Sequence, residues 1–450
     1  MENLLSKVKQ KLKPSKKLQE ELSNLVNLIH QRLQKVLPAD VEILLCGSVA
    51  KGTYLNKNID IDFFLLFGPN YSSEQIKRLG IYYAKKAFGG FKTEVRYAQH
   101  PYLKVFYKEF KIDIVPSSKS LNITKIKTAV DRSQLHTIFI NQNLKEEQKD
   151  DVRLLKKFLE NLGIYGASLR VEGFSGYLCE LLILYYGSFL EVLKAASKWK
   201  KFTVIDIKNY YSQEEAIKIF QPANFIVVDP VDKNRNVAAV VSRTSFSRFV
   251  LAARKFLSRP SIKYFFPNTR KIKISTLKNI IEKRKSNILV LKFKSPDLVE
   301  DILWPQLKKL CLSIVWNLEK EEFRVIDYYF YADVQNCYIL LELLDFQLPK
   351  IKHIVGPEIF DQENVEGFIK KHKKALNIHP EHHQLVAIEK RKICTPIELI
   401  KIIIKNKSKF GIPKGLYNVL SKGKVFSPKE LLRDKTFFYI ACDYFLRKIN

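Results

Sequence analysis

The stretch GSVAKGT at residues 47–53, followed by DIDFFLLF at residues 60–67, decides the fold of the first part of the chain. A β-strand presents every second side chain on one face, so Asp60 and Asp62 point the same way, about 7 Å apart along the strand. Asp113, in FKIDIV, can come alongside them because the segments before it alternate like antiparallel strands. Three such carboxylates suit a hard divalent cation, and we expect them to hold Mg²⁺ in a two-ion site.

Gly47 and Ser48 lie where a strand should give way to a helix. Backbone N–H groups exposed at such a turn, together with the Ser48 hydroxyl, can bind a triphosphate, and Gly47 lets the backbone approach closely. An isolated D-x-D pair is more often a cap or an edge-strand charge pair. Combined with Gly-Ser and a third Asp on a neighbouring strand, it predicts phosphoryl transfer to a hydroxyl with release of pyrophosphate.

The composition points to a polyanionic partner. The 450 residues carry a formal net charge of +31, with 77 Lys and Arg against 46 Asp and Glu, and 46% of the residues are hydrophobic. These values exclude an acidic or disordered scaffold and favour binding to a phosphate backbone. No apolar stretch approaches about 18 residues and no signal peptide is evident, so we expect no membrane partner. Six scattered cysteines without a C-x-x-C pair fit the cytoplasm.

The length allows two to four domains, and the patterns predict a multidomain α+β protein. Residues 1–142 predict a catalytic domain with a mixed sheet, and residues 143–258 predict a mostly helical second domain. Residues 288–391 follow the order β-α-β-β-α-β, which predicts an RRM-like module. The basic segments 259–287 and 392–450, the second of them helical, are assigned to an RNA-binding body.

One basic block is unusually long. From Arg254 to Lys294 it holds thirteen basic residues against a single acid, Glu282, and the aromatic run 264–266 is interleaved with them. Most charge runs are solvated faces, and that interpretation stays open. The length, single sign and aromatic content favour contact with RNA.

The motif GS…DIDFFLLF…KIDIVPS resembles the nucleotidyltransferase superfamily that includes DNA polymerase beta. Within it the chain resembles the archaeal, class I CCA-adding enzymes, which are tRNA nucleotidyltransferases. Five blocks occur in the order typical of that family and span residues 40–258: GSVAKGTYL, DRSQLHT, VRLLKKFLENLGIYGA, GFSGYLCELLI and DPVDKNRNVAAVVS.

The resemblance implies site residues, position by position. It implies Asp60, Asp62 and Asp113 as catalytic metal ligands, Ser48, Lys51, His136, Lys156 and Tyr165 as ligands of ATP or CTP, and Arg235 in base selection. Lys51 is a departure, because the family commonly has Arg there, and a point charge replaces a bidentate fork.

Simpler roles stay open for several of these residues. They are an exposed helix lysine for Lys156, a packed ring for Tyr165, a cap or surface residue for His136, and an ion pair with Asp229 or Asp232 for Arg235. Tyr177 and Glu180 are expected to pack the helical domain rather than touch substrate.

The resemblance implies template-independent addition of C, C and A to the 3′ end of tRNA from CTP and ATP. The protein would hold the acceptor–T arm by its backbone, and a homodimer is plausible from the resemblance alone. The alternative with the same chemistry is a poly(A) polymerase or an oligoadenylate synthetase. An RNA-binding protein with an inactive transferase fold is disfavoured because all three carboxylates are present.

Overall fold

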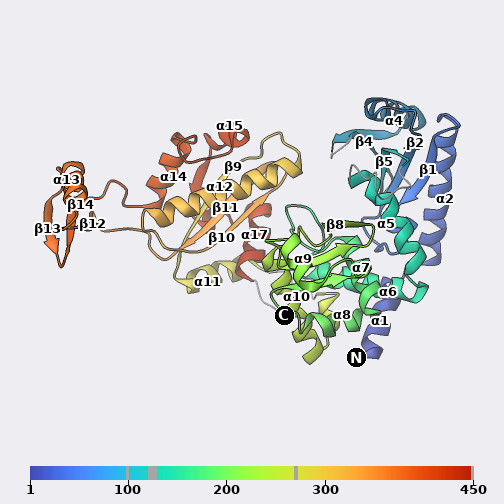
Figure 1. Cartoon of the computed structure of the whole chain (residues 1–450), viewed down its shortest axis with the longest axis horizontal. Helices are drawn as coiled ribbons and strands as arrows, with labels where there is room; N and C mark the ends of the chain where they lie inside the picture. The colour runs from blue at the N-terminus through green and yellow to red at the C-terminus, as the bar shows by residue number, and fades with distance from the viewer. Residues whose placement is uncertain (98–100, 120–128, 268–271, 447–450) are drawn as a thin grey trace. The chain divides into compact units, whose positions relative to one another are not determined.

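The computed structural model describes residues 1–97, 101–119, 129–267 and 272–446. The chain divides into two compact units, Met1–Thr269 and Arg270–Lys448. Figure 1 labels their helices and strands. Among the described residues no single helix is long and apolar enough to cross a membrane. The one helix pair that is long and apolar enough jointly, α7 (Gly176–Tyr186) with α8 (Phe189–Ala196), is bent by 91°.

The first unit begins with a five-stranded mixed sheet, as the sequence predicts. The strand order is β1-β2-β5-β4-β3, and β2 and β5 run parallel whereas the other neighbours are antiparallel. The strands are β1 (Glu42–Cys46), β2 (Asp60–Phe67), β3 (Lys92–Tyr97), β4 (Pro101–Tyr107) and β5 (Phe110–Ser118). Helices α2 (Lys16–Gln34) and α4 (Ser73–Ala87) pack on one face.

The alternation along β2 decides where the acids lie. Ile61, Phe63 and the later odd-numbered residues are buried in the core beneath α2 and α4. Asp60 and Asp62 therefore lie on the opposite face of the sheet, as a period of two requires. The short helix α3 (Gly47–Ala50) follows β1 directly and contacts β2.

A second hydrophobic core lies in the same unit and is mostly helical. Its elements are α5 (Ala129–Asn143), α6 (Glu146–Asn161), α7 (Gly176–Tyr186), α8 (Phe189–Ala196), α10 (Arg243–Ser258), η2 (Ile262–Tyr264) and a three-stranded sheet of β6 (Thr203–Asp206), β7 (Phe225–Asp229) and β8 (Asp232–Asn236), flanked by α9 (Gln213–Ile219). The first helix, α1 (Glu2–Leu12), also buries Leu5, Val8 and Leu12 in this second core, although residues 1–142 were predicted as one domain.

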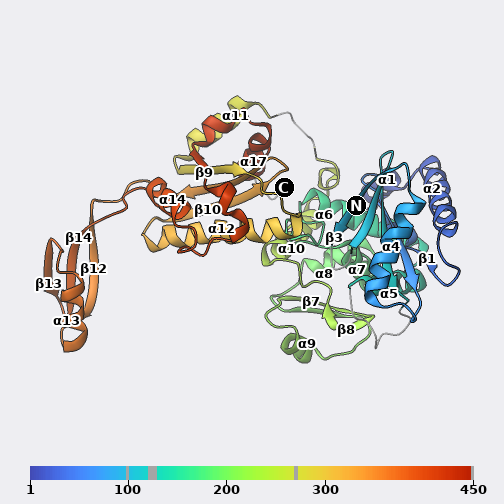
Figure 2. The same cartoon turned by 90° about the horizontal axis from the view of Figure 1, so that it is seen from above.

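The second unit is built on a four-stranded sheet in the order β10-β11-β9-β15. Its strands are β9 (Asn287–Lys294), β10 (Val325–Ala332), β11 (Asn336–Leu343) and β15 (Lys424–Phe426). Helices α12 (Glu300–Lys320) and α14 (Pro396–Lys405) share a core with one face, and α11 (Ile274–Arg284) and α17 (Lys435–Phe445) share a core with the other. Figure 2 shows α12 and the pair α11 and α17 on opposite sides of the sheet. Both faces are buried, which explains the continuous apolar runs of β9 and β11.

The prediction of one RRM-like module over residues 288–391 is wrong in its second half. The strands β12 (Ile351–Glu358), β13 (Asn377–Glu381) and β14 (Gln384–Lys390) form a sheet of their own in the order β12-β14-β13, packed with α13 (Gln362–Lys371). The β-α-β-β-α-β order is completed instead by α14 and β15, from the segment assigned to the basic body. Residues 344–395 are therefore an insertion between β11 and α14, whose ends meet where the Leu348 N–H donates to the Cys394 carbonyl at 2.9 Å.

The remaining elements of this unit are short: η3 (Lys414–Leu416), α15 (Tyr417–Leu420) and α16 (Pro428–Leu431). They connect α14 to β15 and β15 to α17. Leu416 and Leu420 are buried in the same core as α12 and α14, so this connection is part of the packed unit.

Candidate active site

The register of the first sheet brings the predicted carboxylates together. Asp62 lies opposite Asp113 across the parallel pair β2 and β5, and opposite Cys46 on β1. Asp60 lies two residues before Asp62, on the same face, opposite Lys111. The acids of FKIDIV and DIDFFLLF thus occupy neighbouring strands, as their order in the sequence predicts.

The three acids interact strongly. Burial, then the charges of Asp113 and Asp60, raise the pKa of Asp62 to about 7. Burial also raises the pKa of Asp113, although Lys104 acts to lower it. Within the part of the chain that the structure describes, no group of three or more His, Cys, Asp or Glu side chains is already arranged to hold a metal ion.

The residues nevertheless fit a divalent cation. Gly47 has φ +72°, and a Cβ built there would lie 2.0 Å from Asp62 Oδ2, so the turn after β1 closes against this carboxylate. Only glycine allows that approach at low strain. The donors are carboxylate oxygens that repel one another, and a hard cation would relieve the repulsion.

Two predicted phosphate ligands, Lys51 and Lys156, lie beside this turn, and both are buried. The Lys51 ammonium donates to Glu180 Oε2 at 2.5 Å. Lys156 donates to the carbonyl and hydroxyl oxygens of Thr53 at 3.0 and 3.1 Å, and it lies 3.4 Å from Glu180 Oε1. The Thr53 hydroxyl also donates to Glu180, at 2.5 Å. Lys156 is not an exposed helix lysine, and Glu180 is the carboxylate that compensates both cations.

Ser48 and Tyr165 lie close to this cluster. Ser48 is half-buried in α3, and its carbonyl accepts from the Thr53 N–H at 3.0 Å. A Cβ built on Gly176 would lie 3.3 Å from Tyr165 Oη and 3.5 Å from Lys156 Nζ, so the phenol and the ammonium converge on the start of α7. Burial raises the pKa of Tyr165, which keeps its hydroxyl protonated as a donor.

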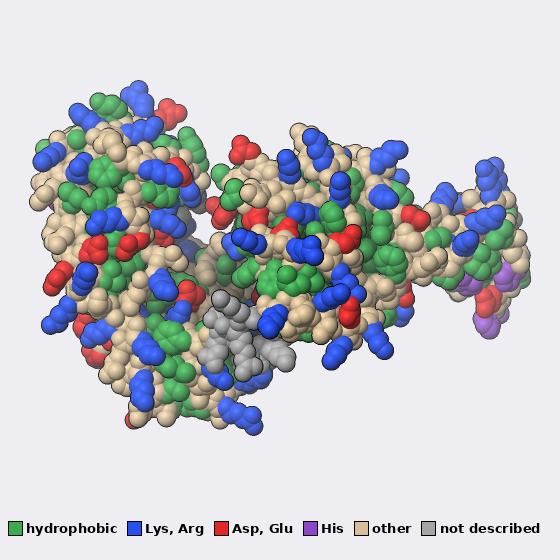
Figure 3. All heavy atoms as spheres, turned by 180° about the vertical axis from the view of Figure 1, so that it is seen from behind, with side chains coloured by type: hydrophobic (Ala, Val, Ile, Leu, Met, Phe, Trp, Pro, Cys, Tyr) green, Lys and Arg blue, Asp and Glu red, His purple; other side chains and the backbone are tan. Residues whose placement is uncertain are grey.

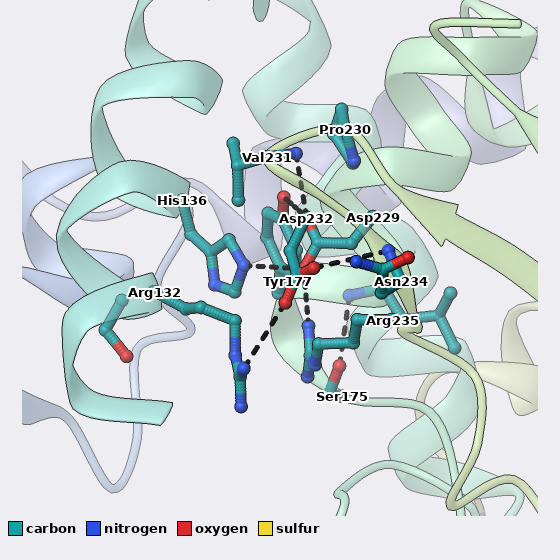
Figure 4. Close-up of polar contacts among 12 residues, drawn as sticks. Arg132, His136, Ser175, Tyr177, Asp229, Pro230, Val231, Asp232, Asn234 and Arg235 are labelled. Carbon is teal, nitrogen blue, oxygen red and sulfur yellow. Dashed lines mark hydrogen bonds and ion pairs between the residues drawn. The ribbon is translucent and has the colours of Figure 1, made fainter. Parts of the chain in front are cut away.

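A second cluster is centred on Asp229, at the end of β7 (Figure 4). This fully buried carboxylate lies 2.9 Å from His136 Nε2, and it accepts from Arg235 Nη1 at 2.7 Å and from the Tyr177 hydroxyl at 3.1 Å. The Val231 N–H also donates to it, at 3.1 Å. The ion pair left open for Arg235 is therefore made with Asp229.

His136 and Arg235 compensate the negative charge of the buried Asp229 carboxylate. Burial acts to raise its pKa, but the contacts with His136 and Arg235 hold the pKa below its ordinary value. Burial lowers the pKa of His136, whose ring stacks on Tyr177 with centroids 3.8 Å apart. Asp232 pairs with Arg132 at 3.3 Å instead (Figure 4). The Arg235 side chain stays about one-third exposed, so part of its guanidinium faces the solvent.

Known protein families match most of the length of the chain. Three family models match it in succession: "Nucleotidyltransferase domain" over residues 26–136, "tRNA nucleotidyltransferase, second domain" over 150–266, and "CCA-adding enzyme, C-terminal domain" over 284–427. The CCA-adding enzyme of Methanocaldococcus jannaschii is 38% identical over 426 residues, which cover 92% of this chain and 93% of the relative. This chain belongs to the CCA-adding enzymes.

Further relatives agree with this assignment. The CCA-adding enzyme of Methanosarcina mazei is 34% identical over 444 residues, covering 96% of each chain, and that of Archaeoglobus fulgidus is 38% identical over 362 residues, covering 80% of each. The resemblance stated from the sequence is confirmed. The C-terminal family model ends at residue 427, just after β15, in agreement with the corrected course of the four-stranded sheet.

Sequence reasoning missed three residues that lie in or beside the candidate site: Glu180, Tyr177 and Lys104. Glu180 and Tyr177 were expected only to pack, yet Glu180 accepts from the predicted site residue Lys51, and the Tyr177 ring stacks on that of His136. A signal for Glu180 existed, because it is the single acid in the apolar helix GYLCELLILYY and needs a buried cation. Lys104 had a weaker signal, since it lies on β4 opposite Asp113 only once the register is known.

Proposed function

We propose that this chain adds C, C and A to the 3′ end of tRNA from CTP and ATP, without a nucleic-acid template, and releases pyrophosphate. The observation that carries the proposal is the similarity to CCA-adding enzymes along nearly the full length of both chains. The three acids on adjacent strands, beside buried lysines, supply the groups that the chemistry needs.

We propose Asp60, Asp62 and Asp113 as the ligands of the divalent cations, and Mg²⁺ in a two-ion site as the natural occupant. When bound, such cations favour the ionised form of the attacking hydroxyl and neutralise the charge of the leaving pyrophosphate. The protein's own contribution is the fixed spacing of the three carboxylates by the pairing of β2 with β5.

The remaining residues bind and orient the nucleotide. Lys51 and Lys156 supply positive charge to the triphosphate, with Ser48 and the N–H groups of its turn as hydrogen-bond donors. Lys156 and Tyr165 converge at the start of α7, which places a cation and a neutral donor at one point. Because the lysines share Glu180, their ammonium groups are held in position before a substrate arrives.

We assign base selection to the Asp229 cluster. One arm of the Arg235 guanidinium is held by Asp229, and the rest can donate to the edge of an incoming base. His136, on the same carboxylate, borders the triphosphate and sugar. A protein pocket of this kind, shaped partly by the growing RNA end, replaces the missing template.

We further propose that the acceptor–T arm is bound through its phosphates by the basic segments 259–287 and 392–450. Figure 3 shows Lys and Arg side chains spread over one face of the second unit, and His side chains gathered on the module of β12, β13 and β14. Recognition through the phosphate backbone suits A-form RNA, because protein side chains cannot read the bases in its deep, narrow major groove. A cytoplasmic location and a homodimer complete the proposal.

The test is incorporation of labelled CTP and ATP onto tRNA transcripts that end at the discriminator base, at C and at CC. We expect two C residues, one A and then a stop. Asp113→Ala should abolish incorporation and leave tRNA affinity nearly unchanged. Long A tails on any RNA would replace the proposal with a poly(A) polymerase, and no incorporation would leave only the RNA-binding function.

A further inference from the structure

One of the proposed metal ligands, Asp113, forms an ion pair with a lysine. Lys104, on β4, lies opposite Asp113 in the antiparallel register of β4 and β5. Its ammonium is 2.8 Å from Asp113 Oδ1 and 3.0 Å from Oδ2, so it straddles the carboxylate. The side chains are only 10% and 17% exposed, which makes this a partly desolvated ion pair rather than a surface contact.

The position of Lys104 follows from the sequence of β4. In PYLKVFY, Leu103 and Val105 are buried in the core beneath α4, so Lys104 must point to the opposite face, where the carboxylates lie. Its charge acts on Asp62 as well as on Asp113. Lys104 thus helps to offset the mutual repulsion of the acids, together with Lys51 near Asp62 and Arg96 near Asp113.

We propose that Lys104 is a resident counter-ion, which holds the Asp113 carboxylate in the metal-free enzyme and competes with divalent cations for it. The inference rests on the proposed role of Asp113 as a metal ligand. An ammonium and a divalent cation repel each other at this distance, so metal binding must move or strain Lys104. The lysine therefore weakens metal affinity while it stabilises the sheet that carries the ligands.

This role makes two opposite predictions for one substitution. Lys104→Met keeps most of the side-chain volume but removes the competing charge. The metal-free protein should lose thermal stability, because Asp113 loses its ion pair and Asp62 loses one of the cations that offset its charge. The dissociation constant for Mn²⁺ should fall, by about fivefold or more, since removing even a modest ion pair has an effect of that order. A lysine with a purely structural role would lower stability without tightening metal binding.

The experiment is a Mn²⁺ titration of the full-length protein without tRNA or nucleotide, in which free Mn²⁺ is measured by electron paramagnetic resonance. Lys92→Met is the matched control, because it makes the same charge change on β3 of the same sheet, where its ammonium lies over the Phe106 ring. Its Mn²⁺ affinity should stay within about twofold of wild type. A Lys104→Met protein with unchanged or weaker Mn²⁺ binding would overturn the proposal.

A second variant covers the case in which Lys104→Met does not fold. Lys104→Arg keeps the charge and offers a bidentate fork to Asp113, so it should weaken Mn²⁺ binding relative to wild type. Tighter or unchanged binding in that variant would overturn the proposal as well. The titration is independent of the incorporation assay: a shifted Mn²⁺ affinity with no CTP incorporation would leave the counter-ion role standing and remove the proposed function. A wild-type protein that binds no Mn²⁺ would remove the counter-ion role.

Discussion

Replacement of Glu180 by glutamine tests whether one carboxylate holds Lys51 and Lys156, the lysines proposed to bind phosphate, in place. Glu180 is fully buried, and it accepts from Lys51 and Thr53 at 2.5 Å each, with Lys156 at 3.4 Å. Glutamine has the same shape and can still accept a hydrogen bond. The change therefore removes charge and leaves packing almost intact.

The magnitude follows from the burial of both partners. The side chains of Lys51 and Lys156 are 7% and 1% exposed, so neither ammonium can be solvated when the carboxylate is lost. Removal of one partner from a buried ion pair costs about 3–5 kcal/mol of unfolding free energy. We expect Glu180→Gln to destabilise the first unit by that amount. Burial already lowers the pKa of Lys156, and loss of Glu180 removes the interaction that opposes this shift.

A compensating substitution sharpens the test. In wild type two lysines and one glutamate leave a single positive charge, whereas Glu180→Gln leaves two. The double variant Lys156→Met with Glu180→Gln restores the single charge. It should be more stable than Glu180→Gln alone by at least about 1 kcal/mol, a coupling expected of residues in direct contact.

The assay is urea unfolding monitored by hydrogen–deuterium exchange of peptides from α6 and α7. This readout reports the stability of the first unit separately from that of the second. Glu191→Gln is the control, because its ion pair with Lys194 on α8 is about half exposed. That change should stay within about 0.5 kcal/mol of wild type. The reasoning is refuted if Glu180→Gln costs less than about 1 kcal/mol, or if the double variant is less stable than the single one.

Three further outcomes are expected. Burial lowers the pKa of His136 in the folded chain. Just below about pH 6.5, the imidazole is therefore protonated in the unfolded chain but stays neutral in the folded chain. Stability should therefore fall as the pH drops through that value, and His136→Asn should flatten this part of a urea-unfolding profile. Replacement of residues 350–391 by a Gly-Ser bridge should leave the melting temperature of the second unit's remaining fold within about 5 °C in circular dichroism, since the insertion has its own sheet. The affinity for tRNA should fall by orders of magnitude between about 50 and about 200 mM salt in filter binding.

The first sheet was predictable because its signals are local. A strand period of two predicted Asp60 and Asp62 on one face, and in the structure that face is the one opposite α2 and α4. The position of Asp113 opposite Asp62 comes from the parallel pairing of β2 with β5, the last strand of the short meander of β3, β4 and β5. Few other pairings were compatible with segments so close in sequence.

The C-terminal sheet was predictable only in part. The elements of residues 288–391 form close to where their patterns indicate, but their pairing depends on distant partners. β15 is three residues long and carries no periodic signal, yet it pairs with β9 more than 120 residues earlier. The strands of the insertion pair with each other instead, and local pattern does not distinguish these outcomes.

In the site, residue types were easier to predict than partners. Lys156 and Arg235 were identified from their motifs, but their carboxylate partners come from elements far apart in the chain. Arg235 had two acids in its own loop, and the structure divides them: Asp229 binds Arg235, and Asp232 binds Arg132 on α5. The choice depends on where α5 packs, which no local pattern reveals.

Helix α7 connects the two clusters, because it contributes a side chain to each of them. Tyr177 and Glu180 are three residues apart, so they project from the same side of the helix. Tyr177 reaches the Asp229 cluster, and Glu180 reaches Lys51 and Lys156. The other sides of α7 are fixed by Leu178, Leu181 and their neighbours in the second core. A rotation of α7 would disturb both the lysines proposed to bind phosphate and the carboxylate that pairs with Arg235. The spacing between the proposed triphosphate and base positions therefore depends on a single helix.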